Sequence, residues 1–147
     1  MNMKKKIGLG LLAVLVLIQF VRPTRNSSTN ENPNEISKSY DVPAEVHAVL
    51  KKSCFDCHSN NTVYPWYTNI QPLGLWLQGH VNEGKSEINF SEFGTYDQKK
   101  AKHKFEEIEE VVGEGEMPLS SYTFIHRDTK LTTEQSSAIA SWAGALK

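Results

Sequence analysis

The chain contains two cysteines, and they stand three positions apart in the segment Cys54-Phe55-Asp56-Cys57-His58. On a helical turn, side chains three and four positions apart leave the same face, so both thiols and the imidazole would lie together. A group bonded to the two sulfur atoms would therefore be held beside the histidine. This spacing is the C-x-x-C-H motif, which is typical of the attachment site of a c-type haem.

Three other interpretations of two close cysteines are weaker here: a disulfide, a thioredoxin-like redox pair, and half of a zinc site. A zinc site needs a second pair of ligands, whereas the other histidines are scattered singly at positions 47, 80, 103 and 126. A thioredoxin-like pair belongs among alternating strands and helices, and the pattern around this motif is helical. We therefore predict that Cys54 and Cys57 attach one haem c covalently and that His58 is an axial ligand of its iron.

The first 22 residues have the composition of an export signal. Lysines at positions 4–6 precede an apolar run over residues 7–21, whose length lies between that of a signal-peptide core and that of a full membrane span. No small-residue cleavage site follows, since the chain turns polar at Arg22. We expect residues 1–22 to be a signal-anchor that enters the membrane through residues 7–21, with a cleaved signal peptide as the alternative. Both predict a domain on the periplasmic side of a bacterial inner membrane.

Residues 23–40 are polar, hold two prolines and offer little to bury, so we expect a flexible linker. Residues 41–147 are the predicted domain. They carry ten basic and fifteen acidic residues, a net charge of −5, whereas residues 1–40 carry six and two, a net charge of +4. An acidic domain argues against nucleic-acid binding, which needs a basic face. It permits a cationic redox partner protein.

Apolar residues recur at helical spacing in four segments of the predicted domain, which indicates an all-α fold. A first helix is expected from about Pro43 into the cysteine motif. A short second helix is expected over residues 73–81, followed by a loop. A backbone carbonyl near Pro65 or Pro72 is expected to receive the second ring nitrogen of His58.

Two further helices follow, each with a recognisable start. The third is expected to run from a capping box of Thr95 and Gln98 to a C-cap at Gly113, with its charged residues on the solvated face. The final helix is expected after a second capping box over residues 131–135 and carries Trp142. We expect this last helix to close the core against the first helix of the domain.

A glycine-rich loop before the final helix holds a candidate second ligand for the iron. Two glycines shortly before Met117, at positions 113 and 115, let the backbone pass close to a flat surface, and Pro118 favours an extended conformation for Met117. A histidine paired with a methionine is a known ligand set of cytochromes c. We therefore predict that Met117 is the sixth ligand opposite His58. His126, and after it His80, are the alternatives.

The order of these features, with terminal helices, the cysteine motif after the first and a methionine-proline strap before the last, resembles class I c-type cytochromes. More closely, five segments resemble the bacterial haem-binding domain family: Cys54–His58, Tyr64–Tyr67, His80–Gly84, Asn89–Ser91 and Gly115–His126. The resemblance covers about residues 41–147. It implies a small all-α, cytochrome c-like periplasmic domain wrapped around one covalently attached haem.

The sequence thus favours a membrane-anchored mono-haem c-type cytochrome, an electron carrier and not an enzyme, with redox proteins as partners. Cys54 and Cys57 would anchor the haem, and His58 and Met117 would bind its iron. The alternative is a haem-based sensor or a peroxidase-like protein with an open or labile distal site. There, a distal histidine would act as an acid or base instead of a ligand. A zinc or disulfide module without haem is the third hypothesis.

Overall fold

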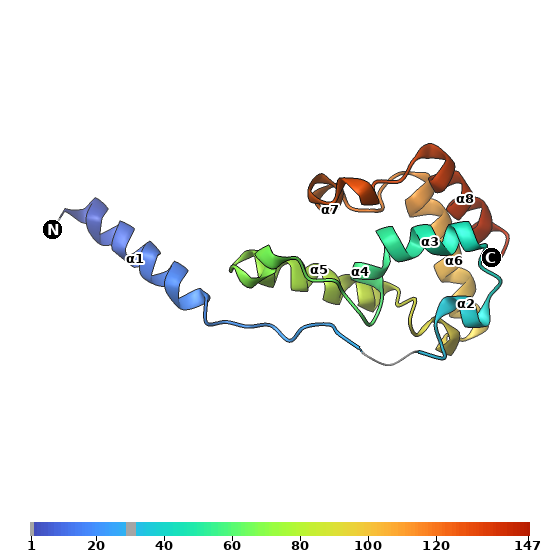
Figure 1. Cartoon of the computed structure of the whole chain (residues 1–147), viewed down its shortest axis with the longest axis horizontal. Helices are drawn as coiled ribbons and strands as arrows, with labels where there is room; N and C mark the ends of the chain where they lie inside the picture. The colour runs from blue at the N-terminus through green and yellow to red at the C-terminus, as the bar shows by residue number, and fades with distance from the viewer. Residues whose placement is uncertain (1, 29–31) are drawn as a thin grey trace.

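The computed structural model describes residues 2–28 and 32–147, and every regular element in those ranges is helical (Figure 1). This confirms the predicted all-α class. Residue 1 of the predicted signal segment and residues 29–31 of the predicted linker lie outside the described residues. The elements are α1 (Met3–Ile18), α2 (Ile36–Ser39), α3 (Ala44–Ser53), α4 (Phe55–His58), η1 (Trp66–Asn69), α5 (Leu73–Glu87), η2 (Phe93–Thr95), α6 (Gln98–Gly113), α7 (Ser120–Ile125), η3 (Arg127–Thr129) and α8 (Thr133–Gly144).

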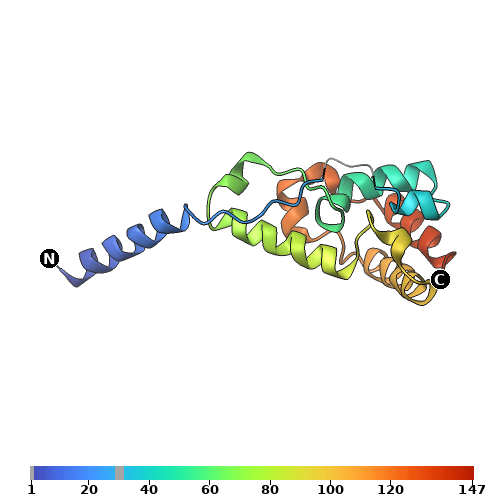
Figure 2. The same cartoon turned by 90° about the horizontal axis from the view of Figure 1, so that it is seen from below.

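Helix α1 projects away from the other helices, and none of its residues is buried (Figures 1 and 2). It covers 16 residues. Among the described helices, none combines the length and the apolar character needed to cross a membrane. The membrane span expected over residues 7–21 is therefore not supported by the structure.

Part of the predicted linker 23–40 makes ordered contacts with the predicted domain 41–147. Ile36 is fully buried, and its backbone N–H donates to the carbonyl of Phe90 at 2.9 Å. Further upstream, the side-chain amide of Asn26 donates to the hydroxyl of Thr62 at 2.8 Å. The polar composition concealed this role, since hydrogen bonds and only two large apolar or aromatic side chains, Ile36 and Tyr40, make the contacts.

The core forms where α6 and α8 pack side by side, with α3 against α8. The rings of Phe105 and Trp142 meet edge to face with centroids 5.5 Å apart. The indole N–H of Trp142 also donates to the carbonyl of Asp41 at 3.0 Å, which ties α8 to the start of the domain. These helices bury the faces that helical spacing predicted, namely Ala101, Phe105, Ile108 and Val112 on α6 and Ile139, Trp142 and Ala143 on α8.

Two helix boundaries differ from the sequence expectation. Helix α5 does not stop at residue 81 but runs on to Glu87, and Gly84 is buried within it. Helix α6 is capped by Asp97, whose side chain accepts from the backbone N–H of Lys100 at 2.7 Å. Thr95, the expected cap, lies in η2 instead. The first difference matters for function, because the added turns of α5 lie against the cysteine motif.

Candidate functional site

The cysteine motif lies at the break between α3 and α4. Cys54 leaves the helical conformation, with φ −123° and ψ −38°, and its carbonyl accepts from the N–H groups of Cys57 and His58 at 3.1 and 3.0 Å. This single turn puts both thiols and the imidazole on one wall of a cavity of about 230 Å³, as the spacing predicted. Both thiols are free.

The two thiols are poorly suited to redox exchange. Burial raises the pKa of Cys54 to about 12. Burial, together with the neighbouring charge of Asp56, raises the pKa of Cys57 to about 11. A redox-active dithiol works with a thiol whose pKa is lowered, so that a thiolate is present at neutral pH. The electrostatics of this site therefore argue against a thioredoxin-like pair.

His58 is held by backbone carbonyls at the end of α5. Its Nδ1 lies 2.8 Å from the carbonyl oxygen of Gly84 and 3.2 Å from that of Ile88. Because carbonyls only accept, Nδ1 carries the proton, and Nε2 keeps its free electron pair. Burial lowers the pKa of His58, although the two hydrogen bonds and the charge of Glu87 oppose this effect. The result is a neutral imidazole in the tautomer that an iron ligand requires.

The carbonyl partner was expected near Pro65 or Pro72, and that expectation is wrong. The carbonyl of Gly84 already accepts from the backbone N–H of Ile88 at 3.0 Å and binds His58 as a second donor, while the carbonyl of Ile88, the C-cap residue of α5, has no partner within the helix. His58 uses these acceptors only because α5 extends beyond residue 81.

Close contact between α4 and α5 depends on Gly84. A Cβ built on this glycine would lie 2.9 Å from the carbonyl oxygen of Cys57 and 3.1 Å from its Cβ. These atoms belong to backbone or to the stem of a side chain and cannot move aside easily. Any larger residue would therefore separate the helix from the motif.

Met117 lines the same cavity as Cys54, Cys57 and His58. Helix α6 ends just before it, and Gly115 turns the chain back with a left-handed φ of +77°. The C-cap of α6 is Glu114, one residue after the expected Gly113. The backbone N–H of Met117 then donates to the carbonyl of Val111 at 3.2 Å, and its side chain packs against the core. The strap predicted from the sequence therefore brings a thioether to the site.

The two alternative ligands fall in different places. His80, on α5, lines the cavity that holds the motif, and its ring lies 4.5 Å from that of Trp76 between centroids. His126 lines only the adjoining cavity, and its Nε2 lies 2.8 Å from the hydroxyl of Tyr67. The structure therefore ranks His80 above His126 as an alternative to Met117, which reverses the order expected from the sequence.

Sequence reasoning missed a pair of residues at the cavity wall. The hydroxyl of Tyr122 donates to Oδ2 of Asp56 at 2.8 Å, and Oδ1 of Asp56 accepts from the backbone N–H of Val63 at 3.0 Å. Burial and the neighbouring carboxylate raise the pKa of Tyr122, so the hydroxyl remains a donor. The only available signal was the carboxylate placed between the two cysteines.

These residues fit a covalently attached haem. Two thiols, a neutral histidine with a free Nε2 and a thioether sulfur border one cavity, and no described residue makes a hydrogen bond to Nε2 of His58. Among the described residues, no three histidine, cysteine or acidic side chains gather to bind a metal ion by themselves. The zinc hypothesis therefore has no ligand set in this part of the chain.

Comparison with known proteins identifies one family. The model of a family described as a haem-binding domain matches residues 13–145. No curated protein and no solved structure matches the chain. Because the match spans most of the sequence and includes the whole cavity, the chain belongs to the haem-binding domain family.

Proposed function

We propose that this protein is a mono-haem c-type cytochrome that carries single electrons and is not an enzyme. One observation carries the proposal: Cys54, Cys57, His58 and Met117 line a single cavity. The cysteines would hold one haem c through thioethers, and the histidine and methionine would occupy the axial positions. A haem held in this way supplies one-electron exchange between Fe(II) and Fe(III).

The residues around the cavity have distinct tasks in this proposal. The carbonyls of Gly84 and Ile88 fix the ring of His58 and increase the basicity of its Nε2. Met117 would be the second protein ligand of the iron. With two protein ligands, the iron would have no place left for a substrate, which suits an electron carrier.

We further propose that the domain works on the periplasmic side of a bacterial inner membrane. The lysines at positions 4–6 and the apolar run over residues 7–21 support an export signal. Paired cysteines of this kind are typical of an oxidising compartment outside the cytosol, and the chain holds only this pair. Redox proteins of that compartment would be its partners.

Absorption spectra of the chain, produced in cells that attach haem c, test the proposal. We expect a low-spin c-type spectrum in both oxidation states, unchanged when carbon monoxide is added to the reduced protein. Haem should stay on the polypeptide through denaturing electrophoresis, and the double variant Cys54→Ala/Cys57→Ala should lose it. Haem that is released from the native chain under these conditions would contradict covalent attachment.

A second candidate is a haem-based sensor or a peroxidase-like protein. The cavity at the motif adjoins another that contains Tyr67 and His126, and the two share the lining residues Cys57, His80, Leu119 and Tyr122. Tyr67, His80 and His126 would be available there as acids or bases for an external molecule bound to the haem. Immediate binding of carbon monoxide by the reduced native protein would favour this candidate over the electron carrier.

A further inference from the structure

On the basis of the function proposed above, we propose that Tyr122 is a positioning residue for the axial ligand Met117. Its hydrogen bond to Asp56 latches the segment that carries Met117 over the cavity. The latch sets how readily the methionine leaves the iron, and therefore how fast an external ligand such as imidazole binds there.

The hydrogen bond joins the two halves of the site directly. Asp56 stands between the two cysteines, and the backbone N–H of Val63 fixes its Oδ1 at 3.0 Å while Oδ2 accepts from Tyr122 at 2.8 Å. Tyr122 lies on α7, which begins at Ser120, shortly after Met117 in the chain. Tyr122 therefore connects the ligand strap to the attachment motif across 66 positions of sequence.

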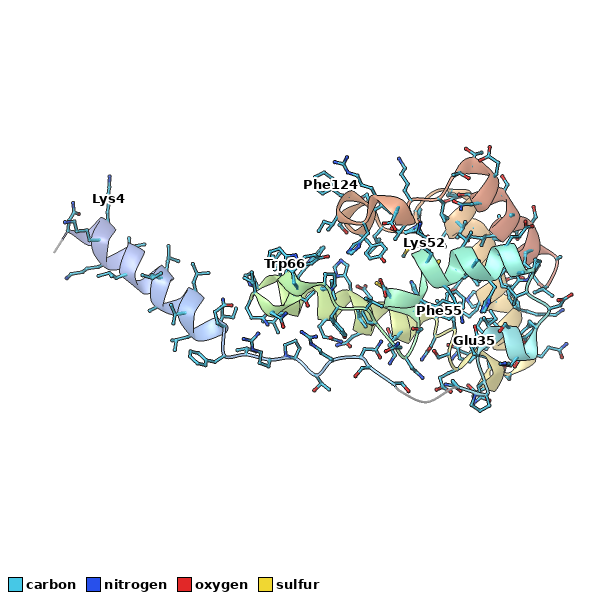
Figure 3. All side chains as sticks on the ribbon, viewed as in Figure 1. Lys4, Glu35, Lys52, Phe55, Trp66 and Phe124 are labelled. Carbon is cyan, nitrogen blue, oxygen red and sulfur yellow. The ribbon has the colours of Figure 1, made fainter. Side chains whose placement is uncertain are left out.

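Few other contacts hold α7 in place. Its main helical neighbour is η3, which directly follows it in the chain. Phe124 and Ile125 are 76% and 52% exposed, so α7 contributes little to the core. Figure 3 shows α7, marked by Phe124, across from the segment marked by Trp66, and residues of both segments line the cavity between them. Side-chain hydrogen bonds across this cavity are therefore the contacts that keep α7 beside the cysteine motif and η1.

A second bridge supports the first. The Nε2 of His126 lies 2.8 Å from the hydroxyl of Tyr67 on η1. The rings of Tyr122 and His126 stack with centroids 4.7 Å apart and planes 26° apart, so the two bridges form one unit. The bond to Asp56 is the stronger of the two, because its acceptor is a carboxylate. When it is lost, the bond between Tyr67 and His126 and the exposed ion pair of Lys52 with Asp128 on η3, at 3.4 Å, must hold the segment.

Tyr122→Phe tests the latch, since it removes the hydroxyl and keeps the ring. Tyr64→Phe is the matched control, because that hydroxyl bonds Gln78 and the backbone of Asn26, away from α7. We expect imidazole to bind the oxidised haem protein about tenfold faster or more in Tyr122→Phe, as loss of a charge-assisted hydrogen bond implies. The sulfur-to-iron charge-transfer band should weaken in the same variant. Tyr64→Phe should leave both unchanged.

Two measurements separate this role from a general structural one. Asp56→Asn keeps an oxygen acceptor for the tyrosine, so it should accelerate imidazole binding less than Asp56→Ala does. Hydrogen exchange of the full haem-free chain should speed up over residues 117–126 in Tyr122→Phe and not over α6.

Unchanged hydrogen exchange and unchanged imidazole binding in Tyr122→Phe would overturn the latch, and so would equal effects in Tyr64→Phe. If the native protein binds no haem, the proposed cytochrome function fails. If it binds haem but shows no sulfur-to-iron charge-transfer band, the proposed ligation by Met117 fails. The exchange experiment on the haem-free chain still decides whether Tyr122 holds the segment.

Discussion

Gly84 lies so close to Cys57 that a Cβ on the glycine would be 2.9 Å from the cysteine carbonyl oxygen. The carbonyl of the same glycine is 2.8 Å from Nδ1 of His58. One residue without a side chain thus sets both the distance between α4 and α5 and the orientation of the imidazole. His58, the proposed haem ligand, is therefore positioned through close packing of two helices.

Gly84→Ala should therefore destabilise the fold, by about 1–3 kcal/mol for an overpacked site. Gly79→Ala, on the same helix, is the control, because no atom lies within 4 Å of a Cβ built there. An alanine in an open helical position should stabilise the protein by about 0.5–1 kcal/mol. Urea unfolding of both variants measures the two effects, and a stabilised Gly84→Ala protein would show that the helices separate at no cost.

Phe105→Ala should remove the centre of the core. Its side chain is fully buried and contacts the rings of Trp142, Tyr40 and Phe93. Loss of such a side chain costs about 3–5 kcal/mol of unfolding free energy. Phe124→Ala is the control, since that ring is 76% exposed and its loss should change stability by less than about 0.5 kcal/mol. Equal losses in the two variants would mean that the core is elsewhere.

Glu35 should make the stability of the domain dependent on acid pH. Burial by itself would raise its pKa, but hydrogen bonds from Ser37 and His47 and the charges of His47 and Lys51 outweigh burial and lower it. The Nε2 of His47 lies 2.8 Å from Oε1 of Glu35.

Because the folded-state pKa is below the unfolded one, the contribution of Glu35 is complete above the ordinary carboxyl pKa and is lost as pH falls through the folded value. Unfolding free energies of the native protein and of Glu35→Gln should converge toward acid pH. A constant difference between the two proteins from pH 7 to pH 3 would show that the carboxylate contributes nothing to the dependence.

Helical periodicity predicted α6 and α8 because each buries one regular stripe, and the capping box of Thr132 and Gln135 marked the start of α8 correctly. The same reasoning ended α5 too early. The residues after Val81 form no apolar stripe, and Gly84 is buried for a reason that lies on another helix. Burial of Ile36 was likewise hidden, since a single apolar residue creates no period.

The candidate site divides in the same way. The common position of the cysteines and His58 at one cavity was predictable because they are neighbours on one turn, and that of Met117 was predictable from the glycines before it and the proline after it. The hydrogen bond between Asp56 and Tyr122 joins residues 66 positions apart in the sequence, and no local sequence pattern predicts it. The carbonyl partners of His58 also come from a distant helix end, which a periodic pattern does not locate.

Met117→Ala should change the iron without releasing the haem. The covalent bonds would come from the cysteines, so haem should still accompany the denatured chain. A thioether ligand raises the potential of haem iron, and its loss should lower the potential, remove the sulfur-to-iron band and allow carbon monoxide to bind the reduced protein. His80→Ala is the control, because His80 lines the same cavity from α5. Its spectrum should match that of the native protein. A band that survives in Met117→Ala would exclude this methionine as the ligand, and a ligand change in His80→Ala alone would assign the axial position to His80.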